Sequence, residues 1–201
     1  MIDRRFPLMF LAAVAMAALV GWATPALPAD TSNTVVLVAK RQLTDPFYRA
    51  TVLLVRPMGN DQHIGVILNR PSKLTLGQLF PEHKPSAAVR DPVYVGGPMS
   101  TSVIFAIVQR PDSPGGKSLQ MMPDVFMAFE APTVDQIIEK QPQQARFVAG
   151  LVAWQPGELT DEIKRGAWFV LNADPALVLR KQTEGMWEEL VRRAELSANG
   201  I

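Results

Sequence analysis

The sequence predicts one α+β domain with its core between about residue 34 and residue 196. Short apolar runs rich in Val, Ile and Leu recur along the chain, turn residues separate them, and capped helical segments interleave with them without regular alternation. With 201 residues, 48% of them hydrophobic, the chain is long enough to bury a core. The lack of cysteine excludes a disulfide scaffold and Cys-ligated zinc or iron-sulfur sites.

Residues 1–29 are predicted to be a cleaved signal peptide. Arg4 and Arg5 give the N-terminus a positive charge, and the stretch 6–22 that follows is apolar and carries no charged residue. Small residues and prolines come next, as is typical of a signal-peptidase site, with cleavage after Ala26 or Ala29. The mature protein is therefore expected in the periplasm or outside the cell.

The alternative for this segment is an uncleaved membrane anchor, because its apolar run approaches the length that spans a bilayer. Pro7 and the proline-rich exit argue against a stable membrane helix. Loss of the leader would remove Asp3, Arg4 and Arg5 and leave equal numbers of basic and acidic residues. A neutral domain lacks the long-range attraction on which non-specific DNA binding depends, so the sequence argues against a nucleic-acid partner.

Eight apolar runs are short enough to be strands. They are Thr34–Ala39, Ala50–Val55, Ile64–Leu68, Val93–Val95, Val103–Val108, Val125–Phe129, Phe147–Ala153 and Ala167–Leu171. Turn residues lie between them, as in 58–61, 69–71, 96–98 and 110–116. Several runs are apolar on both faces, so we expect helices or further strands to cover both sides of the sheet.

Four helices are expected. Thr133 and Gln136 form a capping-box pattern ahead of a helix that Pro142 ends, and Thr75 with Gln78 repeats the pattern for a single turn. Glu158–Arg165, followed by Gly166, is a third candidate. Near the C-terminus Thr183 is expected to cap a helix whose apolar face is formed by Trp187, Leu190, Val191 and Ala194.

Four segments carry short motifs, each of which is weak evidence of a protein family alone but informative when all four occur in order. They are Leu43–Phe47 with Arg49, Thr51 and Val52; Gly65–Pro71 with Leu74, Leu76 and Leu79; Val93–Met99; and Gly150–Leu159 with Glu162, Ile163 and Trp168. In order and spacing, from about Leu43 to Trp187, the chain resembles the YqgE/AlgH family of bacterial proteins. Ala153 and Glu158 stand where that family usually has Gly and Gln, and its members usually begin near the first strand without a leader.

This resemblance implies a compact α+β domain with a strongly bent mixed sheet. It implies little chemistry, because no biochemical activity is established for the family. One branch is labelled a transcriptional regulator of alginate production. That label predicts a cytoplasmic pool and a basic face, whereas this sequence has a leader and no helix-turn-helix pattern.

The motifs gather into one candidate binding surface, which comprises Asp45, Asn69, Arg70, Gly96, Gly97 and Trp154. Arg70 serves either as a fork for an anion or as the partner of an acid such as Asp45 or Glu158. Gly96 and Gly97 either present backbone N–H groups to an anion or allow close packing of two backbones. Trp154 either covers a pocket or fills the core.

The sequence contains no recognisable catalytic or metal-binding pattern. His63 and His83 lack partners at metal-site spacing and are expected at the surface, and adjacent acids such as Asp161 and Glu162 are expected on solvated helix faces. We therefore predict a non-catalytic binding or scaffolding protein without cofactor or metal, whose partner is another protein or a small anion. The alternatives are the regulator of the family label and an enzyme that holds an anionic substrate through Arg70.

Overall fold

The structure, a computed structural model, describes residues 33–198, and the predicted signal peptide lies outside these residues. The strands are β1 (Val35–Ala39), β2 (Val52–Gly59), β3 (Gln62–Ile67), β4 (Pro71–Thr75), β5 (Pro92–Val95), β6 (Met99–Gln109), β7 (Ser118–Met122), β8 (Val125–Ala128), β9 (Ala145–Trp154) and β10 (Trp168–Asn172). The helices are α1 (Leu76–Leu79), α2 (Ala131–Lys140), α3 (Glu158–Lys164), α4 (Pro175–Val178) and α5 (Met186–Ala198), with 3-10 turns at Lys84–Ala88 and Pro142–Gln144.

The strands form one curled, mixed sheet. Its order is β10-β1-β2-β3-β9-β6-β8-β7, and β4 joins through β5, which pairs with β9 in parallel while the other pairs are antiparallel. Because the sheet curls, β7 at one end of this order lies next to β1 and β2, which are near the other end. The Thr34 hydroxyl donates to the Met121 carbonyl, and the Arg56 guanidinium donates to the Gln120 carbonyl. The predicted α+β class and strongly bent sheet are therefore confirmed.

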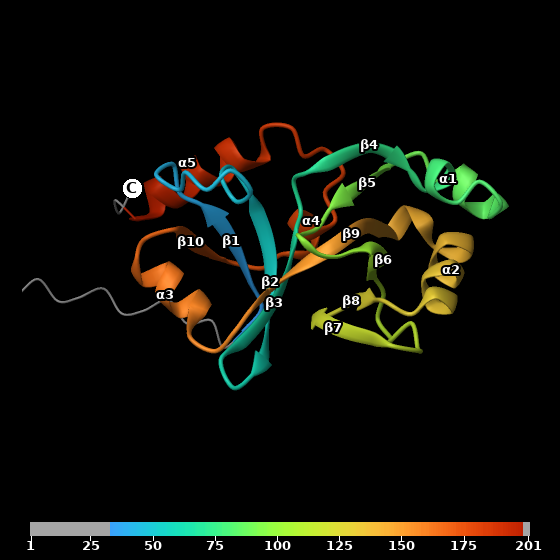
Figure 1. Cartoon of the computed structure of the whole chain (residues 1–201), viewed down its shortest axis with the longest axis horizontal. Helices are drawn as coiled ribbons and strands as arrows, with labels where there is room; N and C mark the ends of the chain where they lie inside the picture. The colour runs from blue at the N-terminus through green and yellow to red at the C-terminus, as the bar shows by residue number, and fades with distance from the viewer. Residues whose placement is uncertain (1–32, 199–201) are drawn as a thin grey trace, which may run out of the picture.

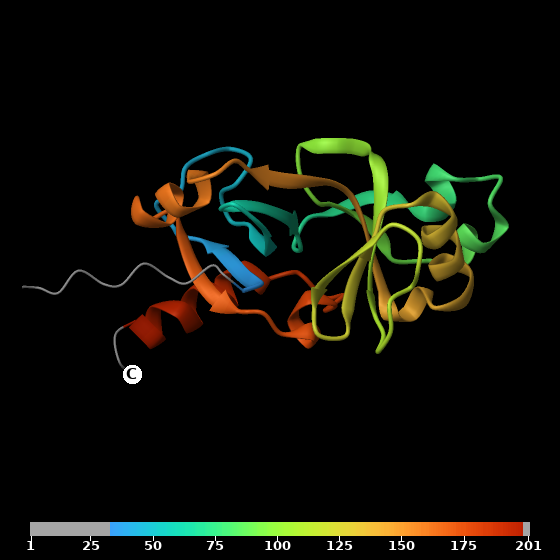
Figure 2. The same cartoon turned by 90° about the horizontal axis from the view of Figure 1, so that it is seen from below.

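Strand β9 joins the two ends of the molecule. It pairs with β3 through residues 152–154, with β5 through 148–149 and with β6 through 145–151. In Figure 1 it runs from the end that holds α1 and α2 toward the end that holds α3 and α5, and Figure 2 shows the same two ends from below. Any change that displaces β9 therefore disturbs both ends of the fold.

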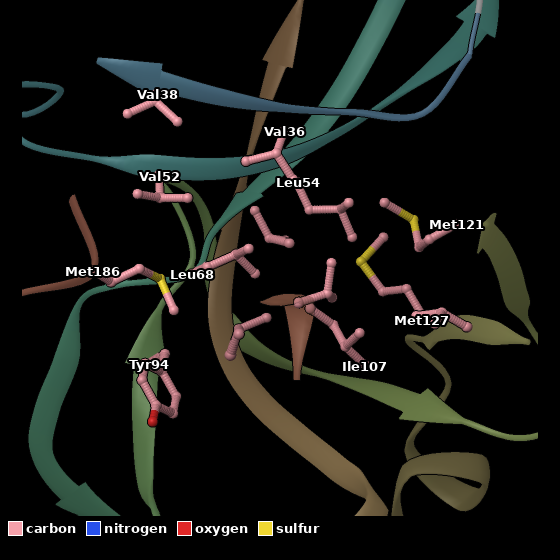
Figure 3. Close-up of a cluster of buried hydrophobic side chains, with 14 of the residues drawn as sticks. Val36, Val38, Val52, Leu54, Leu68, Tyr94, Ile107, Met121, Met127 and Met186 are labelled. Carbon is pink, nitrogen blue, oxygen red and sulfur yellow. The ribbon is translucent and has the colours of Figure 1, made fainter. Parts of the chain in front are cut away.

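Buried apolar side chains fill the inside of the curl. Val36, Leu54, Ile107 and Met127 point toward one another there from β1, β2, β6 and β8, as Figure 3 shows. Two further apolar clusters lie outside the curl. One lies between α2 and β6, β8 and β9, and the other lies between α3 and β1, β2 and β9. The sheet is thus covered on both faces, as its apolar runs predicted.

All eight predicted strands are present, but β4 and β7 were not predicted. Strand β4 begins at Pro71 and is largely exposed, and β7 has only one fully buried residue, Met121. Neither has the apolar run by which a buried strand is recognised. The capping box of Thr75 and Gln78 is confirmed, because each side chain bonds the other residue's backbone N–H at the start of α1.

Two predicted helix starts are wrong. Helix α2 begins at Ala131 after Glu130, with Pro132 in its first turn, and Thr133 is buried inside the helix instead of capping it. Helix α5 begins at Met186, three residues after Thr183. Its predicted apolar face is correct, since Leu190, Val191 and Ala194 are buried. Among the described residues, no helix is both long enough and apolar enough to cross a membrane.

Candidate functional site

The predicted residues with polar side chains meet at the loop between β1 and β2, residues 40–51, which Asp45 shapes. Its Oδ1 accepts hydrogen bonds from the backbone N–H groups of Phe47 (2.8 Å) and Tyr48 (2.9 Å), and its carbonyl accepts one from Arg49 N–H (2.9 Å). Such bonds from a short carboxylate side chain are the usual way to fix a turn. Asp45 therefore sets the positions of Phe47, Tyr48 and Arg49.

Asn69 holds the other end of this loop. Its Oδ1 accepts from Val52 N–H at 2.9 Å, and its Nδ2 donates to the Ala50 carbonyl at 2.9 Å. Both oxygen and amide group are thus engaged by the backbone next to β2. Asn69 therefore fastens the end of this loop to the start of β2.

Arg70 contacts the loop without an ion pair. Its guanidinium lies over the Phe47 ring, 4.9 Å from the ring centre, and donates a long hydrogen bond (3.4 Å) to the Arg49 carbonyl. Within residues 33–198 no carboxylate comes within 4.0 Å of it, so the predicted pairing with Asp45 or Glu158 does not form. Burial lowers the pKa of Arg70, and the nearby negative charge of Asp45 acts in the opposite direction.

Arg70 lies in a pocket of about 620 Å³ that we call the basic pocket. Its lining residues are Lys40, Arg41, Leu43, Thr44, Pro46, Arg49, Ala50, Arg70 and Trp187. Four of these carry a positive charge, and no Asp or Glu is among them. Lys40 lies over the Phe169 ring at 4.8 Å, and Arg41 lies over Trp187 at 5.6 Å while pairing with Glu195 at 3.1 Å. The sequence analysis missed Lys40, Arg41 and Arg49 as members of this group.

Gly96 and Gly97 serve packing. The Gly96 N–H donates to the Ala149 carbonyl, and its carbonyl accepts from Ile67 N–H, both at 2.8 Å. A side chain on Gly97 would overlap the Leu151 carbonyl of β9. The two glycines do not line the basic pocket. Of the two interpretations, close packing of backbones is the one that the structure supports.

Trp154 lies on the opposite side of the loop, where it shares a carboxylate with Trp168. Both rings are buried, and their Nε1–H groups donate to the same oxygen, Oε2 of Glu162, at 3.1 Å and 2.8 Å respectively. The expectation that Glu162 lies on a solvated face is therefore wrong. Adjacent acids on a helix point in different directions, and here only Asp161 points outward, while Glu162 turns toward β9 and β10.

Two hollows meet at Glu162, and together we call them the Glu162 cleft. They have volumes of about 380 Å³ and 330 Å³ and share Tyr48, Glu162 and Arg165 as lining residues. The Tyr48 ring meets the Trp168 ring edge to face, with centres 6.2 Å apart. Burial raises the pKa of the Tyr48 phenol, and the negative charges of Glu162 and Asp45 raise it further. The phenol therefore stays protonated at neutral pH.

The histidines differ from each other. His63 is only 3% exposed, so the expectation of a surface position is wrong for it, because β3 lies between β2 and β9 in the sheet. His83 is partly exposed and has its Nδ1 2.8 Å from the Ser86 hydroxyl. No cluster of three metal-ligating side chains occurs in the described part of the chain.

The loop between β1 and β2 thus separates two different chemical environments. Three arginines and a lysine line the hollow on one side, whereas two carboxylates, a phenol, an indole and a single arginine line the hollow on the other. Asp45, Arg70 and Trp154 take part in this arrangement directly, Asn69 supports it, and Gly96 and Gly97 belong to the packing of β9.

Comparison with known proteins identifies the family. A family model described as AlgH-like matches residues 36–199. The UPF0301 protein of Thermobifida fusca is 32% identical over 167 residues, which cover 79% of this chain and 84% of that protein. A UPF0301 protein of Streptomyces coelicolor is 29% identical over the same shares of both chains.

Solved structures agree on the fold. The solution structure of the AlgH protein from Pseudomonas aeruginosa superposes with a TM-score of 0.69 at 23% identity, covering 85% of this chain and 92% of that one. A crystal structure of a Corynebacterium diphtheriae protein superposes with a TM-score of 0.66 at 24% identity, covering 82% and 87%. The chain therefore belongs to the AlgH-like family, as the resemblance of its motifs indicated.

Proposed function

We propose that this chain is an exported, non-catalytic binding domain that holds a small anion in the basic pocket. The observation that carries the proposal is the convergence of Lys40, Arg41, Arg49 and Arg70 on one hollow whose lining contains no carboxylate. Charges of one sign in a concave site raise the local concentration of the opposite ion. Only Arg41 of the four has a carboxylate partner among the described residues.

The aromatic rings beneath the cations support the same function. Lys40, Arg41 and Arg70 lie over Phe169, Trp187 and Phe47, and a guanidinium held over a ring keeps its N–H edge available for an oxyanion. The pocket is thus pre-organised for an anion with two or more oxygens, such as a phosphate or carboxylate group. Pre-organised cations lose less conformational entropy when the ligand binds.

Pyrophosphate should bind the purified protein, and removal of a pocket arginine should weaken that binding at least about tenfold, because each charge-assisted hydrogen bond contributes about 1.5–3 kcal/mol. The measurement is isothermal titration calorimetry at low ionic strength with wild type, Arg49→Met and Arg70→Met. Arg192→Met is the matched control, since Arg192 is exposed and lies outside the pocket lining.

A variant that is expected to tighten binding complements those that are expected to weaken it. Glu195 pairs with Arg41 at 3.1 Å, so Glu195→Gln should free Arg41 and tighten pyrophosphate binding severalfold, while Glu188→Gln should leave it unchanged. Equal affinities for wild type, Arg70→Met and Arg192→Met would remove the basic pocket from the proposal.

Export is the second part of the proposal, and it rests on the charged start, apolar run and small residues of the leader. N-terminal sequencing of the protein recovered from the periplasmic fraction should begin at Leu27 or Asp30. A protein that begins at Met1 and fractionates with the cytoplasm would contradict export and favour the regulator of the family label.

A further inference from the structure

The Glu162 cleft contains a fixed carboxylate without a cation. Two buried indole N–H groups donate to its Oε2, and no Lys or Arg of residues 33–198 comes within 4.0 Å of it. The other oxygen, Oε1, is left without a bond from either indole. The side chain is half-buried, so this carboxylate lies partly shielded from solvent while its hydrogen-bond partners are neutral indoles.

The walls around this carboxylate are aromatic. Tyr48 and Trp168 line the larger hollow with Leu43 and Ala167, and Trp154 lines the smaller one with Val152. The rings are fixed, because Trp154 and Trp168 are held through Glu162 and Tyr48 packs against both Phe47 and Trp168. Aromatic rings next to a carboxylate are the surroundings that proteins use to bind organic ammonium groups.

The charged side chains that line the cleft are negative, with Arg165 as the one exception. Asp45 belongs to the larger hollow, and Glu158 and Asp161 belong to the smaller one. Arg165 is the only cation in either lining; it is exposed and makes no ion pair with a described carboxylate within 4.0 Å. Anions are therefore disfavoured in this cleft. A metal ion is disfavoured as well, since the described residues provide no cluster of three ligands.

We propose that the Glu162 cleft binds an organic ammonium group, with Glu162 Oε1 as its counter-ion and Tyr48 and Trp168 as its aromatic walls. This site is separate from the basic pocket, because the linings of the Glu162 cleft and of the basic pocket have only Leu43 in common. The protein thus offers one site to an anionic ligand and another to a cationic ligand, on the two sides of a single loop.

The test uses pairs of ligands that differ in charge. Choline and butylammonium are titrated into the isotopically labelled protein, with 3,3-dimethylbutan-1-ol and butan-1-ol as their neutral counterparts, and the indole N–H resonances of Trp154 and Trp168 are followed by NMR. The ammonium ions should shift both resonances saturably, and the neutral alcohols should bind at least about tenfold more weakly, since they leave the carboxylate unpaired.

Variants assign the effect to Glu162. Glu162→Gln keeps an oxygen acceptor for both indoles but removes the charge, so it should lose at least about tenfold in affinity for either ammonium ion. Glu188→Gln removes the same charge from an exposed position outside the cleft and should bind as wild type does. Arg49→Met, in the basic pocket and outside the lining of the cleft, should also bind as wild type, which separates this proposal from anion binding.

Several results would overturn the proposal. They are the absence of saturable shifts with both ammonium ions, equal binding of the ammonium ions and the alcohols, and unchanged binding by Glu162→Gln. The comparison of ligands in the wild-type protein keeps the test decisive even if Glu162→Gln does not fold.

Discussion

Replacing Gly97 with alanine should lower the free energy of unfolding by about 3 kcal/mol or more. A Cβ at this position would overlap the carbonyl group of Leu151 and would lie 2.6 Å from the Val152 nitrogen. These are backbone atoms of β9, which is paired with β3 on one side and β6 on the other. The strand cannot yield without breaking these ladders, so the overlap cannot be relieved by a change of side-chain rotamer.

Urea unfolding followed by circular dichroism measures this loss, with Gly115→Ala as the control. Gly115 has φ +83° and nothing within 4 Å of an added Cβ, so its substitution should cost only about 1 kcal/mol from the backbone conformation. If the two variants unfold at the same urea concentration, close packing of Gly97 against β9 does not contribute to stability.

Apolar patterning was sufficient to predict most of the sheet. Runs such as 35–39 and 52–55 are buried throughout, and such runs have few alternatives to a strand in a covered sheet. Strand β4 differs because its pairing with β5 leaves most of its residues exposed, so no apolar signal exists. Which strands pair, and the parallel pairing of β5 with β9, was not accessible from a single sequence.

The start of α2 shows how tertiary contacts override a local capping motif. Thr133 and Gln136 fit the capping-box pattern, but Pro132 suits the first turn of a helix and allows the helix to begin earlier. The Glu130 carboxylate then accepts from Lys117 N–H at 3.1 Å, and the buried Thr133 lies against Gly116. The loop at 115–117 therefore determines how Glu130 and Thr133 are used.

The candidate site was predicted in part. The motifs placed Asp45, Asn69 and Arg70 together because they lie at the ends of strands that turn out to be neighbours. Lys40 and Arg41 belonged to no motif, and Arg49 belonged to one without being assigned to the binding surface; the convergence of the three follows only from the fold of the loop. Glu162 appeared to be an ordinary surface acid, and its role depends on two indoles, of which Trp154 belongs to β9 and Trp168 to β10.

Arg146 is the second residue whose loss should have a large effect, and the sequence analysis passed over it at the edge of an apolar run. It lies in β9 and is fully buried. Its guanidinium donates to the carbonyls of Leu68 and Arg180 and lies 4.2 Å from the centre of the Tyr94 ring. Burial lowers the pKa of Arg146 to about 10, which leaves it positively charged at neutral pH.

This charge has no carboxylate partner within 4.0 Å among residues 33–198, so carbonyl oxygens and the Tyr94 ring stabilise it. The Tyr94 hydroxyl in turn donates to the Lys181 carbonyl at 3.0 Å, and Lys181 pairs with Asp91 at 2.9 Å. Arg146 therefore connects the end of β3 to the segment that leads from α4 to α5. This connection helps hold α5, which carries Trp187 of the basic pocket, against the sheet.

Arg146→Met should lower the free energy of unfolding by about 3 kcal/mol or more, because the buried Leu68 carbonyl and the partly buried Arg180 carbonyl lose their donor and the methionine supplies no replacement. Arg146→Lys should recover only part of that loss, since an ammonium lacks the planar fork that reaches both carbonyls. Arg192→Met, at an exposed position of α5, should change stability by less than about 0.5 kcal/mol. Urea unfolding provides the comparison, and equal stabilities of the Arg146→Met and Arg192→Met proteins would show that β3 and α5 are held together without the guanidinium.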